Sequence, residues 1–300
     1  MIIVKIKGGL GNQLFQYASA AALAGKNNTD LFFDLSFFEK DSYKDVYRLD
    51  RYPINAKTAN RQDIDKLKNL NSPGFLFRLL KKFRINNKYY RKSHCNERNL
   101  NNYLKDKFRL NYSIYLEGWL ANPNYFDEIR DQLLSVLIPK KVSSLTLEVS
   151  QKISNCDSIA VHIRRGDYLN KPYFVNLSTS YYRQAISYMI GNIKEPKFFF
   201  FSDDIDYVKH EYRDIENAVF LDFNNNKTNE YSTLRDVEDL YLISQCKHQI
   251  IANSTFSWWG AWLNDNVNKI VIAPKTWSNN KAAQKRYEKG SLIPETWLKI

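Results

Sequence analysis

Cysteine is scarce in this chain of 300 residues, and long apolar runs are absent. Cys95, Cys156 and Cys246 are widely separated and include no C-x-x-C pair, so we expect free thiols in a reducing compartment and neither a disulfide framework nor a zinc site. No apolar run reaches the roughly 18 residues that a membrane-spanning helix needs, and the amino-terminal M-I-I-V-K-I-K-G-G-L is unlike a signal peptide. These absences predict a soluble protein of the cytoplasm.

Several familiar functional motifs are missing as well. The glycines near the amino terminus do not have the G-x-G-x-x-G spacing of a dinucleotide-binding loop. The adjacent pair Asp203-Asp204, which follows the phenylalanine-rich strand at residues 197–201, does not itself have the D-x-D spacing with which many nucleotide-sugar transferases hold a metal ion. No RNA-recognition, KH or zinc-finger pattern occurs, and there is no internal repeat or low-complexity segment.

The composition is that of a large globular chain with a basic surface. Apolar residues make up 44% of the chain, which is ample for one large or two medium domains. The formal net charge of +12 favours an anionic partner, which could be nucleic acid, an anionic membrane surface or a phosphorylated small molecule. The excess positive charge is concentrated between about residues 43 and 92, where we expect amphipathic helices, and basic residues are interleaved with aromatic ones in the segment 78–92. Charge alone does not choose among these partners.

Strand and helix patterns alternate along most of the chain. An apolar strand, a glycine turn and an alanine-rich helix open the sequence, as they open a doubly wound unit. After a polar stretch at residues 139–156, strands and helices alternate again, which implies a second parallel sheet. We expect two doubly wound α/β domains, at residues 1–150 and 151–300. The expected strands are residues 2–6, 31–35, 113–120, 159–163, 197–201, 218–223, 249–252 and 269–273.

The most informative stretch is S-I-A-V-H-I-R-R-G-D-Y, residues 158–168. Its apolar start predicts a buried strand, and its carboxyl end carries His162, Arg164, Arg165 and Asp167. Ligands of open α/β sheets bind beyond the carboxyl ends of the strands, and guanidinium groups donate paired hydrogen bonds to phosphoryl oxygens. The stretch is therefore a candidate diphosphate site. The alternative is a solvated basic turn in which Asp167 only pairs with an arginine.

The amino-terminal loop G-G-L-G-N-Q, residues 8–13, is a second candidate. Its glycines permit a positive φ angle or the close approach of another molecule, to which Asn12 and Gln13 could offer amide groups. An ordinary strand-to-helix turn is the alternative.

A further polar strand end is expected at Asn253, Ser254 and Thr255, which precede a helix directly. The N–H groups of a first helical turn and small polar side chains can seat a phosphate, although either hydroxyl could serve only as an N-cap. The tryptophans within residues 258–262 are at helical spacing, which indicates core packing and not a sugar platform.

Acidic residues raise two more hypotheses. Asp239 is on the preceding helix, and its carboxylate could accept the N1–H and N2–H groups of guanine, or it could be a surface acid. Asp203 and Asp204 follow the strand at residues 197–201 and could hold a divalent metal, but a helix N-terminal signal is the favoured interpretation.

Four stretches together resemble the α-1,2-fucosyltransferases of glycosyltransferase family 11, particularly the bacterial ones. They are G-G-L-G-N-Q-L-F-Q-Y-A, H-I-R-R-G-D-Y, F-F-F-F-S-D-D and I-I-A-N-S-T-F-S-W-W-G-A-W-L. The resemblance implies a GT-B-like fold of two Rossmann-type domains facing each other across a cleft, the first on the acceptor side and the second binding the donor. It also implies inverting transfer of L-fucose from GDP-β-L-fucose to O2 of a galactose, with no metal or other cofactor.

The same resemblance assigns roles to single residues. Arg164 matches the arginine that binds the donor's β-phosphate, His162 lies near the nucleotide, and Asp167 orders the arginines. Asp239 looks like the guanine reader, and Asn12 matches an asparagine that faces the sugar from the amino-terminal domain, so we group Asn12 with Arg164 as catalytic. The remaining expected donor-binding residues are Arg165, Asn253, Ser254, Thr255 and Phe256. No residue is assigned as the general base.

The implied acceptor is a galactose-terminated oligosaccharide of O-antigen or another surface glycan. Many bacterial relatives use lipid-linked acceptors, which together with the basic segment at residues 78–92 suggests peripheral association with the inner face of the cytoplasmic membrane. One alternative is a related inverting glycosyltransferase that moves another sugar or forms another linkage. A basic nucleic-acid-binding protein is disfavoured, because it leaves the H-x-R-R-x-D-Y and N-S-T-F-S stretches unexplained, so we expect no nucleic-acid partner.

Overall fold

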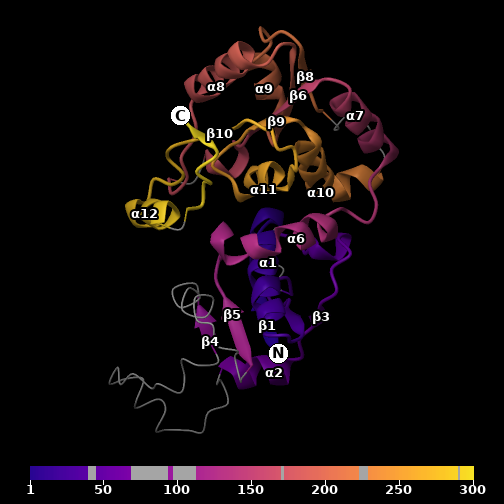
Figure 1. Cartoon of the computed structure of the whole chain (residues 1–300), viewed down its shortest axis with the longest axis vertical. Coiled ribbons are helices and arrows are strands. Elements are labelled where there is room, and N and C mark those ends of the chain that lie inside the picture. Colours follow the sequence, from indigo (N-terminus) through magenta and orange to yellow (C-terminus); the bar gives the residue numbers. More distant parts are fainter. Residues whose placement is uncertain (40–44, 69–93, 97–112, 170–171, 223–228, 290) are drawn as a thin grey trace. The chain divides into compact units, whose positions relative to one another are not determined.

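A computed structural model describes residues 1–39, 45–68, 94–96, 113–169, 172–222, 229–289 and 291–300 (Figure 1). The chain divides into two compact units, the first made of residues 1–50 and 54–135 and the second of residues 51–53 and 136–300. The division lies before helix α7 (Ser144–Ser154) and not at residue 150, because this helix packs in the second unit. Ser143 and Thr146, at the start of α7, donate hydrogen bonds to the buried carboxylate of Glu238 on helix α10 (Asn229–Gln245).

The first unit is a parallel sheet in the order β3-β2-β1-β5-β4. Its strands are β1 (Ile2–Lys5), β2 (Leu31–Asp34), β3 (Lys57–Thr58), β4 (His94–Asn96) and β5 (Ile114–Glu117). Its helical elements are α1 (Leu10–Lys26), η1 (Leu49–Arg51), α2 (Arg61–Lys68), η2 (Pro123–Tyr125), η3 (Asp127–Ile129) and α6 (Arg130–Val136). The last residues of η1 and α6 belong to the second unit.

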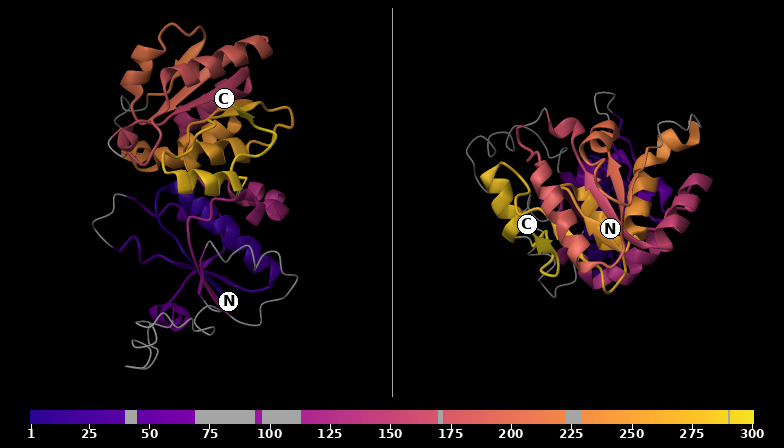
Figure 2. Two further views of the ribbon diagram at one scale, coloured as in Figure 1. Left: turned by 90° about the vertical axis from the view of Figure 1, so that its left-hand side faces the viewer. Right: turned by 90° about the horizontal axis from the view of Figure 1, so that it is seen from above.

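The alternation of apolar side chains along β1 fixes which helix covers which face of the first sheet. Ile3 packs with Tyr115 and with two apolar residues of α2. On the opposite face, Phe33 of β2 makes an edge-to-face contact with Tyr17 of α1. Figure 2 shows α1 running along the sheet. Because both faces are covered, the central strands β1 and β5 are apolar except at their carboxyl ends, where Lys5 pairs with Glu117.

The second unit is a parallel sheet in the order β11-β10-β9-β6-β7-β8. Its strands are β6 (Asp157–Ile163), β7 (Pro196–Ser202), β8 (Ala218–Phe220), β9 (His248–Ile250), β10 (Val271–Ala273) and β11 (Leu298–Lys299). Besides α7 and α10, its helical elements are η4 (Gly166–Tyr168), α8 (Thr179–Asn192), α9 (Ile205–Glu211), α11 (Thr255–Leu263) and α12 (Lys281–Lys289).

The strand β6 lies in the middle of this sheet and supplies side chains to two cores. Ile159, Val161 and Ile163 pack with α8 and α9, whereas Ala160 packs with α7 and α10. Figure 1 accordingly shows α8 and α9 on one side of the sheet and α10 and α11 on the other. The prediction, made from its apolar run, that this strand is buried on both faces is confirmed.

In each sheet, the direction in which successive strands are added reverses beside the central strand. In the second unit, the chain proceeds outward from β6 to β7 and β8 and then returns to the other side of β6 at β9. In the first unit, it proceeds from β1 to β2 and β3, and β5 later pairs with the free side of β1. The prediction of two doubly wound parallel α/β domains is confirmed, and ligands of such sheets bind beyond the strand ends at these switch points.

Two expectations concern membranes and the basic segment. Within the described residues, no helix has the length and apolar character to cross a membrane. The amphipathic segment expected at residues 78–92 lies outside the described residues, as does the side chain of Cys95. Cys156 and Cys246 are free thiols, as the sequence predicts.

Candidate functional site

Most of the predicted donor-binding residues of the second unit lie at or just beyond the carboxyl ends of two adjacent strands, β6 and β9. In the parallel register, Ile163 at the end of β6 is opposite Ser202 at the end of β7, and β9 ends on the other side of β6. Arg164 and Arg165 therefore follow β6, and Ser254 and Thr255 follow β9, on the two sides of the switch point. This is the place where the doubly wound topology predicts a ligand.

Arg164 is held by an acid from the neighbouring strand. Its Nη1 is 3.0 Å from Oδ2 of Asp203, which follows β7, and its guanidinium lies over the ring of Tyr168 at 5.7 Å from the ring centroid. The second oxygen of Asp203, Oδ1, accepts a hydrogen bond of 2.9 Å from the backbone N–H of Arg165. One carboxylate thus orients both arginines, and the guanidinium of Arg164 remains partly exposed to solvent.

Arg165 has a second acidic partner and an aromatic one. Its Nε donates to Oδ2 of Asp204 at 3.0 Å, and its guanidinium lies 3.3 Å from the ring centroid of Tyr207. Gly166 is required beside this arrangement, because a Cβ atom there would collide with the Asp203 carboxylate. Stacking together with the ion pair limits the rotamers of Arg165, so its charge is positioned before any ligand arrives.

Asp203 and Asp204 follow β7, a position from which the sequence suggests either a metal site or a helix start. Asp204 is the N-cap of α9, where its side chain accepts a hydrogen bond from the N–H of Tyr207, so the predicted helix signal is confirmed. Within the described residues, no group of three or more His, Cys, Asp or Glu side chains is placed to hold a metal ion. Asp167 falls in η4, but its side chain lies outside the described part of the structure, and its expected ordering of the arginines stays a prediction.

His162 is buried near the carboxyl end of β6, on the face of the sheet that α10 and α11 cover. Its ring centroid is 5.3 Å from that of Phe256, and its Nδ1 is buried without a hydrogen-bond partner among the described residues. Burial, and then the charge of Arg164, lowers the pKa of His162 to about 3. The imidazole is therefore neutral near pH 7 and can exchange hydrogen bonds with a ligand but not carry charge to it.

The loop after β6 is tied to the loop after β9. The ring of Tyr168 stacks on Phe174 with centroids 4.1 Å apart, and its hydroxyl donates to the backbone oxygen of Asn253 at 3.1 Å. The amide nitrogen of Asn253 donates to the backbone oxygens of Val175 and Trp277 at 3.0 and 3.1 Å. Asn253 therefore shapes the rim of the site through its side chain, and its expected contact with the donor stays a prediction.

Ser254 is the N-cap of α11, and its hydroxyl accepts a hydrogen bond of 3.3 Å from the N–H of Phe256. Ser254 therefore acts as an N-cap, and its expected contact with a phosphate stays a prediction. Thr255 is the first residue of the helix, where backbone N–H groups can also bind an anion. Trp258, Trp259 and Trp262 are buried, which confirms that they belong to the core.

Asp239 is not a surface acid, since only 13% of its side chain is exposed. Its Oδ2 is 3.4 Å from Nε of Arg235, and Nη2 of the same arginine donates to the backbone oxygen of Ser202 at 3.0 Å. Arg235 thus joins α10 to the end of β7 and places the Asp239 carboxylate near the same sheet edge. The role of Asp239 as guanine reader stays a prediction.

The amino-terminal loop corrects one expectation. Gln13 does not offer its amide to another molecule, because the side chain is buried and donates to the backbone oxygens of Gly8 and Val46, both at 2.8 Å. Its oxygen accepts from the N–H of Arg48 at 2.9 Å. Asn12 belongs to the first unit, unlike the other predicted site residues, and its amide nitrogen lies close to Gly8. Its expected catalytic role stays a prediction.

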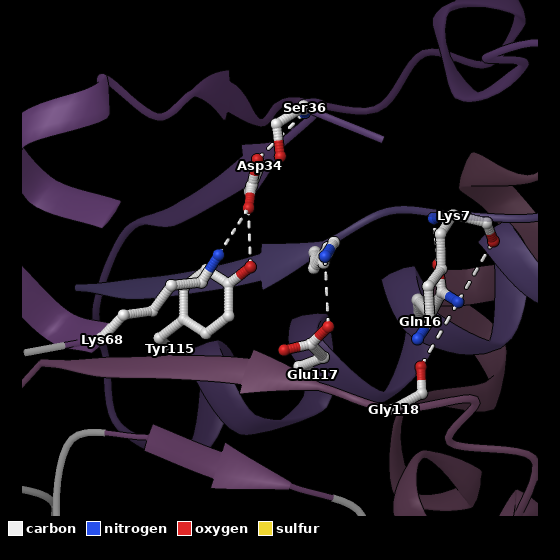
Figure 3. Close-up of polar contacts among 9 residues, drawn as sticks. Lys7, Gln16, Asp34, Ser36, Lys68, Tyr115, Glu117 and Gly118 are labelled. Carbon is white, nitrogen blue, oxygen red and sulfur yellow. Dashed lines mark hydrogen bonds and ion pairs between the residues drawn. The ribbon is translucent and has the colours of Figure 1, made fainter. Parts of the chain in front are cut away.

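The first unit contains a buried acid that the sequence did not indicate. Asp34 accepts hydrogen bonds from the hydroxyl of Tyr115 at 2.6 Å and from the N–H of Ser36 at 3.0 Å, and Lys68 is 3.5 Å away (Figure 3). Burial alone would raise the pKa of Asp34, but these hydrogen bonds and the lysine outweigh it and lower the pKa. Because no part of its side chain is exposed, Asp34 stabilises the sheet and is not placed to act as a base on a substrate.

Sequence reasoning overlooked the acids and the arginine that orient the site. The sequence pattern indicates Asp203 and Asp204 as metal ligands or as a helix start, and the structure shows them as partners of Arg164 and Arg165. For Arg235, the signal available was its spacing of four residues from Asp239, which brings opposite charges together on one helix face.

Comparisons with known proteins agree with the geometry. The model of glycosyl transferase family 11 matches residues 1–299. The chain is 32% identical to an α-1,2-colitosyltransferase of Escherichia coli, with 100% of this chain and 99% of that protein covered. It is 31% identical to the O-antigen biosynthesis glycosyltransferase WbnK of Escherichia coli, with 98% and 99% covered. The solved structure of the fucosyltransferase NodZ from Bradyrhizobium is similar in fold, with a TM-score of 0.51 at 12% identity, over 86% of this chain and 90% of that one.

Proposed function

Because the chain belongs to glycosyl transferase family 11, we propose that it transfers L-fucose from GDP-β-L-fucose to O2 of a β-galactosyl acceptor with inversion, forming an α-1,2 linkage in an O-antigen or another surface glycan. The name of the colitosyltransferase relative favours the α-1,2 linkage, and that of WbnK favours O-antigen synthesis. The donor and the galactose are proposed from the motif resemblance. The related alternative is transfer of another sugar, colitose above all, through the same site.

The observation that carries the proposal is the pair of arginines at the switch point of the second sheet. As the bond between C1 of fucose and the β-phosphate oxygen breaks, negative charge grows on the phosphate and positive charge on the sugar ring. Arg164 would donate hydrogen bonds to that phosphate, and because Asp203 and Tyr168 already orient it, little reorganisation is needed in the transition state. The acceptor O2 forms the new bond to C1 from the opposite face and loses its proton, while GDP leaves with the bonding electron pair.

The remaining donor contacts follow from the same arrangement. The first N–H groups of α11, with Ser254 and Thr255, would bind the diphosphate, and Asp239 would accept the N1–H and N2–H groups of guanine. The neutral imidazole of His162, with its buried Nδ1, would contact the nucleotide beside Phe256. Asn12 would contribute from the first unit, and the general base stays unassigned.

Product analysis tests the proposal directly. The enzyme is incubated with GDP-fucose or GDP-colitose and a panel of β-galactosides, and the linkage and anomeric configuration of each product are determined. We expect an α-1,2-fucosyl galactoside, and turnover by Arg164→Lys reduced by about 100- to 1000-fold, because an ammonium cannot reproduce the two-pronged contact of a guanidinium. Transfer only from GDP-colitose, or another linkage, would establish the related alternative.

Metal independence is part of the proposal. Because a side chain neutralises the leaving group, turnover should be unchanged in excess EDTA, and a loss that Mn²⁺ or Mg²⁺ restores would contradict this assignment. We also propose that the acceptor can be lipid-linked and that the protein associates peripherally with anionic membranes. Co-sedimentation with anionic vesicles, weakened by salt, is the expected result, and equal behaviour with neutral vesicles would contradict it.

A further inference from the structure

One tryptophan differs from all the others in its exposure to solvent. The chain has six, and five of them, Trp258, Trp259, Trp262, Trp277 and Trp297, are at most 6% exposed. Trp119, in the first unit, is 47% exposed. An indole carries the largest apolar surface of any side chain, so leaving it half in water forgoes much of the stabilisation that burial would bring. The half-exposed indole is therefore a candidate surface for contact with a ligand.

Trp119 lies where the first sheet would bind a ligand. It comes two residues after the end of β5, and β5 pairs with the central strand β1 at the switch point of this sheet. Gly8 and the start of α1 follow β1 on the other side of that point. The position corresponds within the first unit to that of Arg164 and Ser254 within the second, because both sites lie beyond the carboxyl ends of the strands where the winding reverses.

The indole is held in place by its neighbours. Gly8 has a φ of +78°, and a Cβ atom there would lie 3.2 Å from Cζ3 of Trp119 and 3.0 Å from Nδ2 of Asn12. The Lys7 ammonium is 4.8 Å from the ring centroid. Gln16 accepts from the N–H of Lys7 at 2.9 Å and donates to the oxygen of Gly118 at 3.3 Å, which ties the two strand ends together (Figure 3). A ring fixed in this way loses little conformational entropy when a ligand binds.

The mixture of groups around the indole suits a sugar. A pyranose has an apolar face of C–H groups and a polar rim of hydroxyls, and in β-galactose the C–H groups from C3 to C6 form a continuous patch. An indole face matches the patch, and the Lys7 ammonium over the ring and the Asn12 amide beside Gly8 are donors for sugar hydroxyls. A purely apolar partner would leave the ammonium without a complementary group.

We propose that Trp119, with the Lys7 ammonium over part of its ring, is a stacking platform for a pyranose ring of the acceptor glycan. The identification of the sugar as the acceptor rests on the proposed function, whereas the platform itself rests on the contacts above. This assignment gives the first unit a defined role in acceptor recognition and makes Trp119 a specificity-determining residue.

Fluorescence quenching tests the platform without any turnover. Trp119 is the tryptophan that acrylamide should reach most readily, because the other five are buried. With GDP present, lactose should protect the wild-type protein from quenching, and maltose, which lacks galactose, should protect it less. Trp119→Phe should remove most of the quenching signal and thereby identify its source. Equal quenching with and without lactose at saturating concentrations would overturn the proposal.

Kinetics provide the second readout. Trp119→Ala should raise the acceptor KM by about tenfold, as the loss of an aromatic stacking contact predicts, with the Kd for GDP within twofold of wild type. Trp119→Phe should restore most of the acceptor affinity. The control is Tyr188→Ala on α8, which removes another half-exposed aromatic ring from the second unit and should change neither constant.

The outcomes separate this inference from the proposed function. Fucosyl transfer with an unchanged acceptor KM in Trp119→Ala overturns the platform and leaves the function intact. Protection by lactose without transfer from either GDP-sugar overturns the function and leaves the platform intact. If Trp119→Ala instead abolishes self-association or vesicle binding and leaves the acceptor KM unchanged, the indole is a contact of that kind and the proposal is wrong.

Discussion

Replacing Asp203 by asparagine tests whether the arginines depend on their partner from β7. The carboxylate has one oxygen on the backbone N–H of Arg165 and the other on Nη1 of Arg164. An asparagine that keeps its oxygen on Arg165 turns its NH2 group toward Nη1, so that two donors face each other. We expect the guanidinium of Arg164 to leave its position.

The effects of this change on stability and on catalysis differ in size. The ion pair is partly solvated, with the Arg164 side chain 36% and that of Asp203 25% exposed, so its loss should lower the free energy of unfolding by only about 1 kcal/mol. That corresponds to a fall of roughly 2–4 °C in Tm. A charged group displaced by about 1 Å from the reacting atoms can cost about 100-fold in rate, or about 2.7 kcal/mol in the barrier. We therefore expect kcat to fall by about 10- to 100-fold.

Steady-state transfer from GDP-fucose, with Tm measured in parallel, separates the two effects. The control is Asp206→Asn, which removes a nearby carboxylate that is 94% exposed on α9 and should leave kcat within twofold of wild type. If Asp203→Asn also retains kcat within twofold while Arg164→Lys loses two decades or more, Asp203 does not position Arg164 and the reasoning is refuted.

Three further predictions follow from the same site. Gly166→Ala should force the Asp203 carboxylate aside and reproduce the kcat loss of Asp203→Asn, and the double variant should show no additional loss if the two act through one contact. Asp239→Asn should weaken GDP binding by roughly 2–4 kcal/mol in a calorimetric titration. Glu238→Gln, which weakens the attachment of α7, should lower Tm and leave GDP affinity unchanged. If Glu238→Gln weakens GDP binding and Asp239→Asn does not, Asp239 is excluded as the guanine reader. Because the pKa of His162 is about 3 in the folded protein and roughly 6.5 in a solvated histidine, its contribution to stability is complete above about pH 6.5 and is lost as the pH falls toward 3. Tm should therefore fall more steeply with acidification in the wild type than in His162→Phe, and parallel Tm curves would contradict the buried, neutral state.

Much of the fold could be predicted because the signals for it are local. The apolar run of β6 favours a short buried strand, and the glycines before α1 favour a turn between a strand and a helix. The family, too, is indicated by contiguous motifs, and its prediction is confirmed. Element ends are less well indicated: β8 ends at Phe220, before the expected residue 223.

What the sequence by itself determined is the kind and order of the elements and the residues that follow each strand, including Arg164 after β6 and Ser254 after β9. Only the tertiary structure decided which side chains meet. Asp203 is 38 residues from Arg165 in the chain, and they touch because β7 pairs with β6 in a register that aligns their ends. Exposure was equally undetermined, since Trp119 and Trp258 both belong to apolar stretches, yet one is half-exposed and the other buried. Local patterns report the conformation of a segment, whereas strand order, register and burial depend on free energies summed over contacts between distant segments.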